Sequence, residues 1–367
     1  MLLAGQSLSL GLVATPPIST TPLADAWMFA QGVDAYTVGG ALKAISTLVE
    51  DGAGGAGETP ASGIADNLLQ PSLLSSHGLS AAQYDLIKKG AAPYAAGLAQ
   101  VDAGLALVPA IGTYAFGGVV LIHGETDNQI RWNDDTYQAD LIQFQADYEA
   151  DIQAKVGAVP VPLMISQLSS WTAAACGGVA QSRIPICQYK ASKANPTGLP
   201  MLGPKYFLAH VGADGVHMTS ASSRRLGAYA AKAIRAGSAW RPLWPTLVQR
   251  AGAVITATFN VPVAPLVLDT VLVTDPGSYG FEFTDDSGSP PAISSVALQG
   301  TTQVVITLAS TPTGANKLLR YAYTGTAGNN GGPTTGPRGC LRDSDPDTDR
   351  DGSHLYNWCV HFEEACP

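Results

Sequence analysis

Apolar runs alternate with helical patterns through the first two thirds of the chain. Four runs predict buried strands, each followed by polar or glycine-rich residues, at positions 1–4, 73–76, 118–122 and 161–166. Apolar residues at helical spacing predict helices over residues 80–89, 136–156 and 219–236. Alternating strands and helices are typical of a layered domain with a parallel sheet. We therefore expect a layered α/β domain with a mostly parallel sheet over residues 1–245.

The pattern changes after the segment RPLWP, which ends at Pro245. Short β-type runs without helical spacing follow, separated by turn residues such as Asp-Pro-Gly and Asp-Ser-Gly. This pattern predicts a small all-β sandwich over residues 250–325. Residues 326–367 then form a tail whose Leu355, Trp358 and Phe362 are too apolar for a free terminus. We expect the tail to dock on the body of the protein.

Composition narrows the class of protein. Of the 367 residues 46% are hydrophobic, and no run approaches the roughly 20 apolar residues that a membrane-spanning helix needs. The net charge is −9 and only 13% of residues are charged, so the chain offers no basic stripe to neutralise a phosphate backbone. We expect a globular protein that binds neither membrane nor nucleic acid.

Five cysteines fall in two groups along the chain, without any CxxC spacing. Cys176 and Cys187 are close enough in sequence for a short disulfide loop, and two of Cys340, Cys359 and Cys366 could pair. Free buried thiols are the alternative. We expect one or two disulfides.

Two short segments carry the residues of a nucleophile and its base. Ser7 follows Gly5 and Gln6 where the first strand ends, and a serine there exposes its hydroxyl at the carboxyl edge of the sheet. Asp214 and His217 lie three residues apart, just before the helix at 219–236. A tight turn lets the carboxylate orient the imidazole, so one loop can deliver an oriented base.

Two further segments place polar groups beside the same edge. His123, Glu125 and Asp127 follow the very apolar strand at 118–122, and Gly78 follows the second strand, where its backbone N–H can approach a ligand. With His217, the first three residues could be assembled into a metal site, but no metal-ligand spacing supports one. We expect no metal and no other cofactor.

These four segments resemble the four sequence blocks of the SGNH (GDSL-type) hydrolases, and most closely the sialate O-acetylesterase-like carbohydrate esterases. The resemblance implies a three-layer fold and a serine esterase that removes O-acetyl groups from a carbohydrate or acetylated polysaccharide. It implies that Ser7 is the nucleophile, His217 the general base and then acid, and Asp214 the residue that holds the imidazole. The backbone N–H groups of Ser7 and Gly78 would bind the oxyanion, and Gln6 would lie near the substrate.

One departure concerns Glu125, which stands where the wider superfamily has an asparagine that donates to the oxyanion. An ionised carboxylate cannot donate. Glu125 is therefore protonated, or His123 or a backbone N–H donates instead, or Glu125 orients other groups of the site. Glu125 and His123 remain candidate substrate-binding residues, and so does Gly57, which could also replace Gly78 as oxyanion donor.

Two other functions fit parts of the sequence. The β-sandwich could be the working part of a glycan-binding or structural module of a virion or cell surface, with little or no catalysis. A metal-dependent hydrolase could use His123, Glu125 and His217. Residues 347–352 begin like a calcium loop, but Trp358 at the twelfth position favours a solvated acidic turn.

A polymeric substrate and disulfides would fit an extracellular, secreted or virion-associated protein; the oligomeric state stays open.

Overall fold

A parallel five-stranded sheet forms the centre of the computed structural model, which describes residues 1–50 and 57–367. The strands lie in the order β5-β1-β6-β7-β8 and span Ser75–Ser76 (β5), Leu2–Gly5 (β1), Val119–Ile122 (β6), Leu163–Gln167 (β7) and Met201–Pro204 (β8). All neighbouring pairs are parallel. β8 was not predicted, and the strand predicted at 73–76 is divided between β5 and β4.

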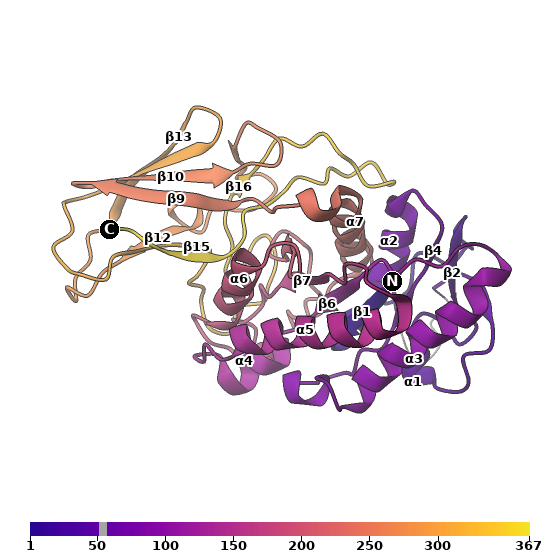
Figure 1. Ribbon diagram of the computed structural model, residues 1–367. Helices are drawn as coiled ribbons and strands as arrows, with labels where there is room; N and C mark the ends of the chain where they lie inside the picture. The colour runs from indigo at the N-terminus through magenta and orange to yellow at the C-terminus, as the bar shows by residue number, and fades with distance from the viewer. Residues whose placement is uncertain (51–56) are drawn as a thin grey trace.

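Helices cover both faces of this sheet (Figure 1). They are α1 (Ala35–Val38), α2 (Pro60–Leu68), α3 (Ala92–Leu107), α4 (Glu125–Arg131), α5 (Tyr137–Val156), α6 (Ile184–Ala194) and α7 (Ser220–Ala236). Helices α3, α5 and α6 pack along one face, and α2 packs against α7 on the other. A small sheet in the order β3-β2-β4 lies beyond this centre, built from Ile45–Thr47, Ala26–Phe29 and Ser72–Leu73. The predicted three-layer α/β/α fold is confirmed.

Helix α7 is fixed by an unusually close crossing with α2. A Cβ atom on Gly63 would lie 1.8 Å from the Arg224 carbonyl oxygen, and one on Gly227 would lie 2.0 Å from the Pro60 carbonyl oxygen. Any side chain at either position would push the helices apart, because protein interiors are close-packed. Helix α7 begins three residues after His217, so this crossing also fixes the position of the C-terminal end of the loop that contains His217.

The helix predicted over residues 80–89 is wrong. Only a short 3-10 turn, Tyr84–Leu86, forms there. Ala81 has a positive φ of 54°, and the Tyr84 N–H donates to the Asp127 carboxylate. This contact from a distant segment competes with the local helical pattern. Gly78 therefore does not open a helix.

The C-terminal part is all-β, as predicted. One antiparallel sheet has the order β13-β14-β10-β9, from Ile293–Gln299, Gln303–Leu308, Val254–Asn260 and Trp244–Ala251. A second has the order β12-β15-β17, from Phe281–Thr284, Leu318–Tyr321 and Phe362–Ala365, and β11 (Val267–Leu268) pairs with β16 (Leu341–Arg342). A continuous apolar core includes Val304, Ile306, Leu319 and Phe362.

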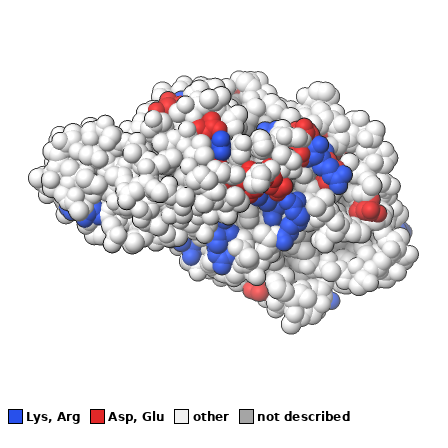
Figure 2. Space-filling view, turned by 90° about the horizontal axis from the view of Figure 1, so that it is seen from above, with Lys and Arg blue, Asp and Glu red and all other residues white. Residues whose placement is uncertain are grey.

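The acidic segment near the C-terminus runs back over α7 (Figure 1). Asp345 lies 2.7 Å from the Lys232 ammonium, and Asp347 lies 2.8 Å from the Arg235 guanidinium. On the face drawn in Figure 2, charged side chains of both signs gather over the α/β part, and few lie on the β end. Within residues 1–50 and 57–367, no group of three or more His, Cys, Asp or Glu side chains is placed to hold a metal ion. The acidic segment at Asp345 and Asp347 thus pairs with the cationic side chains of α7.

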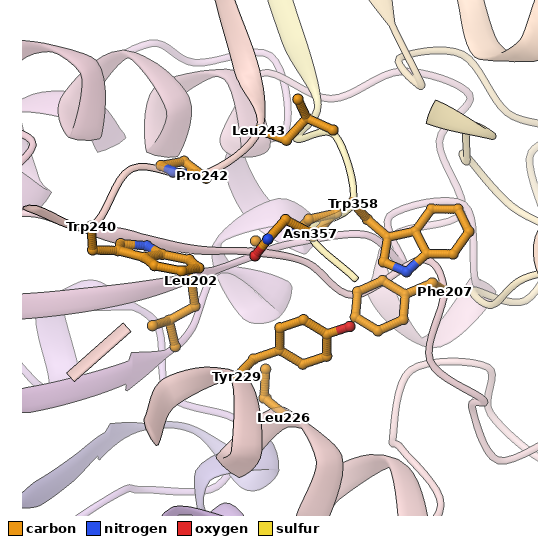
Figure 3. A pocket seen from close by; sticks show the side chains of 11 residues that line it. Leu202, Phe207, Leu226, Tyr229, Trp240, Pro242, Leu243, Asn357 and Trp358 are labelled. Carbon is orange, nitrogen blue, oxygen red and sulfur yellow. The ribbon is translucent and has the colours of Figure 1, made fainter. Parts of the chain in front are cut away.

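Aromatic side chains fill the junction between the two parts (Figure 3). Trp358 stacks on Phe207 with ring centroids 5.6 Å apart, and Phe207 meets Tyr229 of α7 edge-on at 5.1 Å. The Trp240 indole donates to the Met201 carbonyl oxygen over 2.8 Å. The C-terminal segment therefore packs on β8 and α7 as part of the interior.

The prediction of disulfides is wrong. All five cysteines are free and buried. Cys176 points to the Glu125 carbonyl oxygen, whereas Cys187 on α6 points to the loop at Asp134 and Asp135. Closeness in sequence did not bring the two thiols together, and the cysteines give no support to an extracellular location. Among the described residues, no helix has the length and apolar character to cross a membrane.

Candidate functional site

Ser7 stands at a sharp turn at the carboxyl end of β1. It is the first residue of a 3-10 turn, Ser7–Leu10, and is 6% exposed. Gly5 makes the turn possible: its φ is +125°, and a Cβ atom there would lie 2.0 Å from the Ile122 carbonyl oxygen of β6. The strand can leave the sheet so tightly only with glycine at this position. The hydroxyl is thereby held at the sheet edge, as predicted.

The Asp214 turn brings its histidine to this serine. His217 Nε2 lies 2.8 Å from Ser7 Oγ, and His217 Nδ1 lies 2.8 Å from Asp214 Oδ2. The second carboxylate oxygen accepts the backbone N–H groups of Val216 and His217, at 2.8 and 2.9 Å. The turn thus folds its own backbone around the carboxylate.

Electrostatics keeps this carboxylate ionised. Partial burial raises the pKa of Asp214, but the two backbone N–H groups and the His217 ring outweigh it, so the pKa lies below its usual value. An anionic Asp214 accepts from Nδ1, which then carries the ring proton and leaves Nε2 as the acceptor for the Ser7 hydroxyl. The arrangement is able to draw a proton from Ser7 Oγ.

Gln6 and Gly78 lie beside the Ser7 turn. The Gln6 side-chain oxygen accepts the Thr126 N–H over 3.1 Å, so the amide NH₂ is the end left to bind a ligand. A Cβ atom on Gly78 would lie 2.2 Å from Ser9 Oγ, which places its backbone directly against the turn. Its N–H is 3.3 Å from Ser76 Oγ, at the long end of hydrogen-bond lengths.

Of the three alternatives for Glu125, a protonated carboxyl that donates to the oxyanion does not fit the surroundings of this side chain. Its carboxylate is 2.9 Å from the Lys205 ammonium, with the two side chains 2% and 0% exposed. Burial raises the pKa of Glu125, but the Lys205 ammonium and hydrogen bonds outweigh it, so the pKa lies below the usual range. The group is therefore ionised and cannot donate. A buried ion pair at the first residue of α4 fits an orienting role.

His123 is not placed to bind substrate either. It is 1% exposed, with Nδ1 2.7 Å from the Tyr137 hydroxyl and Nε2 3.0 Å from the Ala82 carbonyl oxygen. Both ring nitrogens are thus occupied inside the protein. Gly57 is excluded as an oxyanion donor, because its N–H donates to the Gly11 carbonyl oxygen over 3.1 Å.

Lys205 is the site residue that the sequence analysis missed. It follows β8 directly, and its backbone N–H donates to Ser169 Oγ over 2.9 Å. A lysine at the end of a buried strand would have been noticed had β8 been recognised, because unpaired lysines are almost never fully buried.

Comparisons with known proteins agree with this fold. No family model and no curated protein sequence matches the chain. A carbohydrate acetylesterase from Xanthomonas citri is similar in structure, with a TM-score of 0.67 and 13% identity over 99% of this chain and 79% of that one. A protein of Arabidopsis thaliana and the protein NanS match with TM-scores of 0.46 and 0.47, at 12% and 11% identity, each over 64% of this chain and 96% of theirs.

The similarity to the Xanthomonas citri structure extends over both the α/β part and the β part, since it covers nearly the whole chain. At this level of identity it establishes the fold and leaves the chemistry to be argued from the site. The chain has a three-layer α/β/α fold with a C-terminal β domain, which is the architecture that the sequence resemblance implies.

Proposed function

We propose that this protein is a serine esterase that removes O-acetyl groups from a carbohydrate. The observation that carries the proposal is the chain of two 2.8 Å contacts from Ser7 Oγ through His217 to Asp214 at the carboxyl edge of the sheet. The structure that shares its fold over 99% of the chain is described as a carbohydrate acetylesterase, which supports the choice of substrate class.

In the first step Ser7 Oγ attacks the acetyl carbonyl carbon while His217 Nε2 takes the hydroxyl proton. Asp214 stabilises the imidazolium and keeps Nδ1 pointed at its own carboxylate. The proton then passes from Nε2 to the sugar oxygen, so the alcohol leaves and an acetyl group remains on Ser7. Water repeats the sequence, releasing acetate and restoring the serine.

The developing oxyanion needs donors beside Ser7. We assign this role to the backbone N–H groups of Ser7 and Gly78, with the Gln6 amide NH₂ as a third candidate. Each such donor contributes roughly 3 to 4 kcal/mol to transition-state stabilisation in comparable enzymes. The Glu125–Lys205 pair supports the start of α4, whose Thr126 N–H orients the Gln6 amide.

The test is acetate release from p-nitrophenyl acetate and from a panel of acetylated polysaccharides. Wild type is compared with Ser7→Ala and with Ser295→Ala, an exposed serine on β13, with and without EDTA. We expect activity to be lost in Ser7→Ala alone and to be insensitive to EDTA. Full activity of Ser7→Ala would overturn the proposal, and activity that EDTA abolishes would favour the metal-dependent alternative.

A further inference from the structure

A segment of the C-terminal part lies directly against the turn that carries Asp214. The Asn330 side-chain NH₂ donates to the Gly212 carbonyl oxygen over 3.0 Å, across 118 residues of sequence. The Gly331 backbone N–H donates to the Gly215 carbonyl oxygen over 2.9 Å. The two accepting carbonyls lie on either side of Asp214, so the segment holds the turn at both ends of the catalytic carboxylate.

The same segment is anchored on its other side to the loop that follows β7. The Gly328 N–H donates to the Thr172 carbonyl oxygen over 2.7 Å, and the Thr172 hydroxyl donates to the Asn329 carbonyl oxygen over 2.7 Å. Thr335 Oγ1 closes the segment on itself by donating to the Asn330 carbonyl oxygen. A segment with these anchors can resist displacement and is not a loose linker.

The fit over Gly215 is tight. Gly215 has a φ of +68°, and a Cβ atom there would lie 2.2 Å from Asn330 Oδ1. The amide of Asn330 therefore fills the space that a side chain at position 215 would need. Hydrogen bonds within the turn, such as the one from the Gly215 N–H to the Val211 carbonyl oxygen at 2.9 Å, join residues of the turn to one another. They do not connect the turn to the rest of the protein.

We propose that Asn330 is a positioning residue for the esterase reaction. It acts through the 212–215 backbone on Asp214 and hence on the orientation of His217, and it does not touch the substrate. The C-terminal part thereby completes the site of the α/β domain. The proposal rests on the proposed function, because it assigns Asn330 a role in that same reaction.

Two variants of Asn330 separate positioning from folding. Asn330→Ala removes the side chain, and Asn330→Asp keeps its shape but replaces the NH₂ donor with an oxygen that faces the Gly212 carbonyl. We expect kcat for p-nitrophenyl acetate to fall about tenfold or more in both, with KM within about twofold, because small displacements of catalytic groups act on the chemical step. Asn329→Ala, which removes an exposed neighbouring side chain, is the matched control and keeps wild-type kcat.

A double-mutant cycle tests the contact itself. Gly215→Ala forces its methyl group against Oδ1, Cγ and Cβ of Asn330, which lie 2.2, 2.4 and 2.6 Å away, so it should lower kcat less in combination with Asn330→Gly, which removes all three atoms. Independent effects of the two substitutions would contradict the packing argument. Thermal unfolding of each variant checks that the loss of kcat exceeds any loss of folded protein.

Covalent labelling of Ser7 distinguishes a failure of this inference from a failure of the proposed function. A fluorophosphonate that labels activated serines is added, and the labelled residue and rate are read by mass spectrometry. No labelling of Ser7 in the wild type would remove the proposed function and the inference with it. Labelling of wild type and Asn330→Ala at the same rate, with equal kcat, would overturn the positioning role alone.

Discussion

Replacing Lys205 with methionine should destabilise the protein strongly at neutral pH. The ammonium lies 2.9 Å from the Glu125 carboxylate, and both side chains are at most 2% exposed. Lys205→Met fills similar volume but leaves the carboxylate buried without a counter-charge. Breaking a buried pair in this way costs about 3 to 5 kcal/mol. That is a large part of the roughly 5 to 15 kcal/mol that keeps a typical protein folded.

The loss should depend on pH in a defined direction. In the wild type the pKa of Glu125 is depressed, so its contribution is present above the unfolded value of about 4.3 and is lost as the pH falls through the folded pKa. Without Lys205, we expect burial to outweigh the remaining backbone hydrogen bond and the His123 ring and to raise this pKa. The variant then takes up a proton as the pH falls from 8 towards 5, and the difference from wild type shrinks.

The assay is urea unfolding followed by tryptophan fluorescence at pH 8, 6 and 5. The control is Lys205→Met combined with Glu125→Gln, which replaces the charged pair by neutral groups and should recover about half of the loss or more. A loss below about 1 kcal/mol at pH 8, or a loss that does not change with pH, would refute the ion-pair account.

Three further outcomes are expected. Asp214→Asn should lower kcat by about 10⁴-fold with the fold intact, because the amide holds the wrong imidazole tautomer; initial rates with p-nitrophenyl acetate measure this, and a loss under tenfold would contradict it. Burial lowers the pKa of His77 and His210 to about 4 and that of His361 to about 3. The stability that comes from burying these rings in the neutral form is therefore complete above the unfolded pKa of about 6.5 and is lost as the pH falls towards 4. Denaturation midpoints between pH 7 and 4 measure this loss, and a flat profile would count against it. All five thiols should react with a thiol reagent once the protein is unfolded without reductant. In the folded protein they should resist the reagent, because they are buried and burial raises the pKa of Cys176 and of Cys359. Fewer than five reactive thiols in the unfolded protein would indicate a disulfide.

The sequence predicted the site residues that lie next to a strongly patterned strand or helix. Ser7 and Asp214 with His217 were found because each follows or precedes a strongly patterned element, and the structure brings them within hydrogen-bond distance. Glu125 was identified, but its charge depends on Lys205, 80 residues away, and no local pattern reveals such a partner.

Several helices and strands were not predicted because their apolar residues lack a clear helical or strand periodicity. Helix α3 is rich in alanine and glycine and has apolar residues all around, so no face stands out. Strand β8 is four residues long and contains glycine and proline, which lower strand propensity. Strand β9 begins in the proline-rich segment interpreted as a boundary. In each case packing against distant residues overrides the local signal.

The central claim is that Ser7 carries the acetyl group of the substrate during the reaction. Wild type and Ser7→Ala are mixed with an acetyl ester, quenched in acid within the first turnovers, and digested for mass spectrometry. The account predicts a peptide that contains Ser7 with one added acetyl group in the wild type and an unmodified peptide in the variant. Rapid acetate release with no acetylated Ser7 at any quench time, together with unchanged turnover by Ser7→Ala, would contradict it.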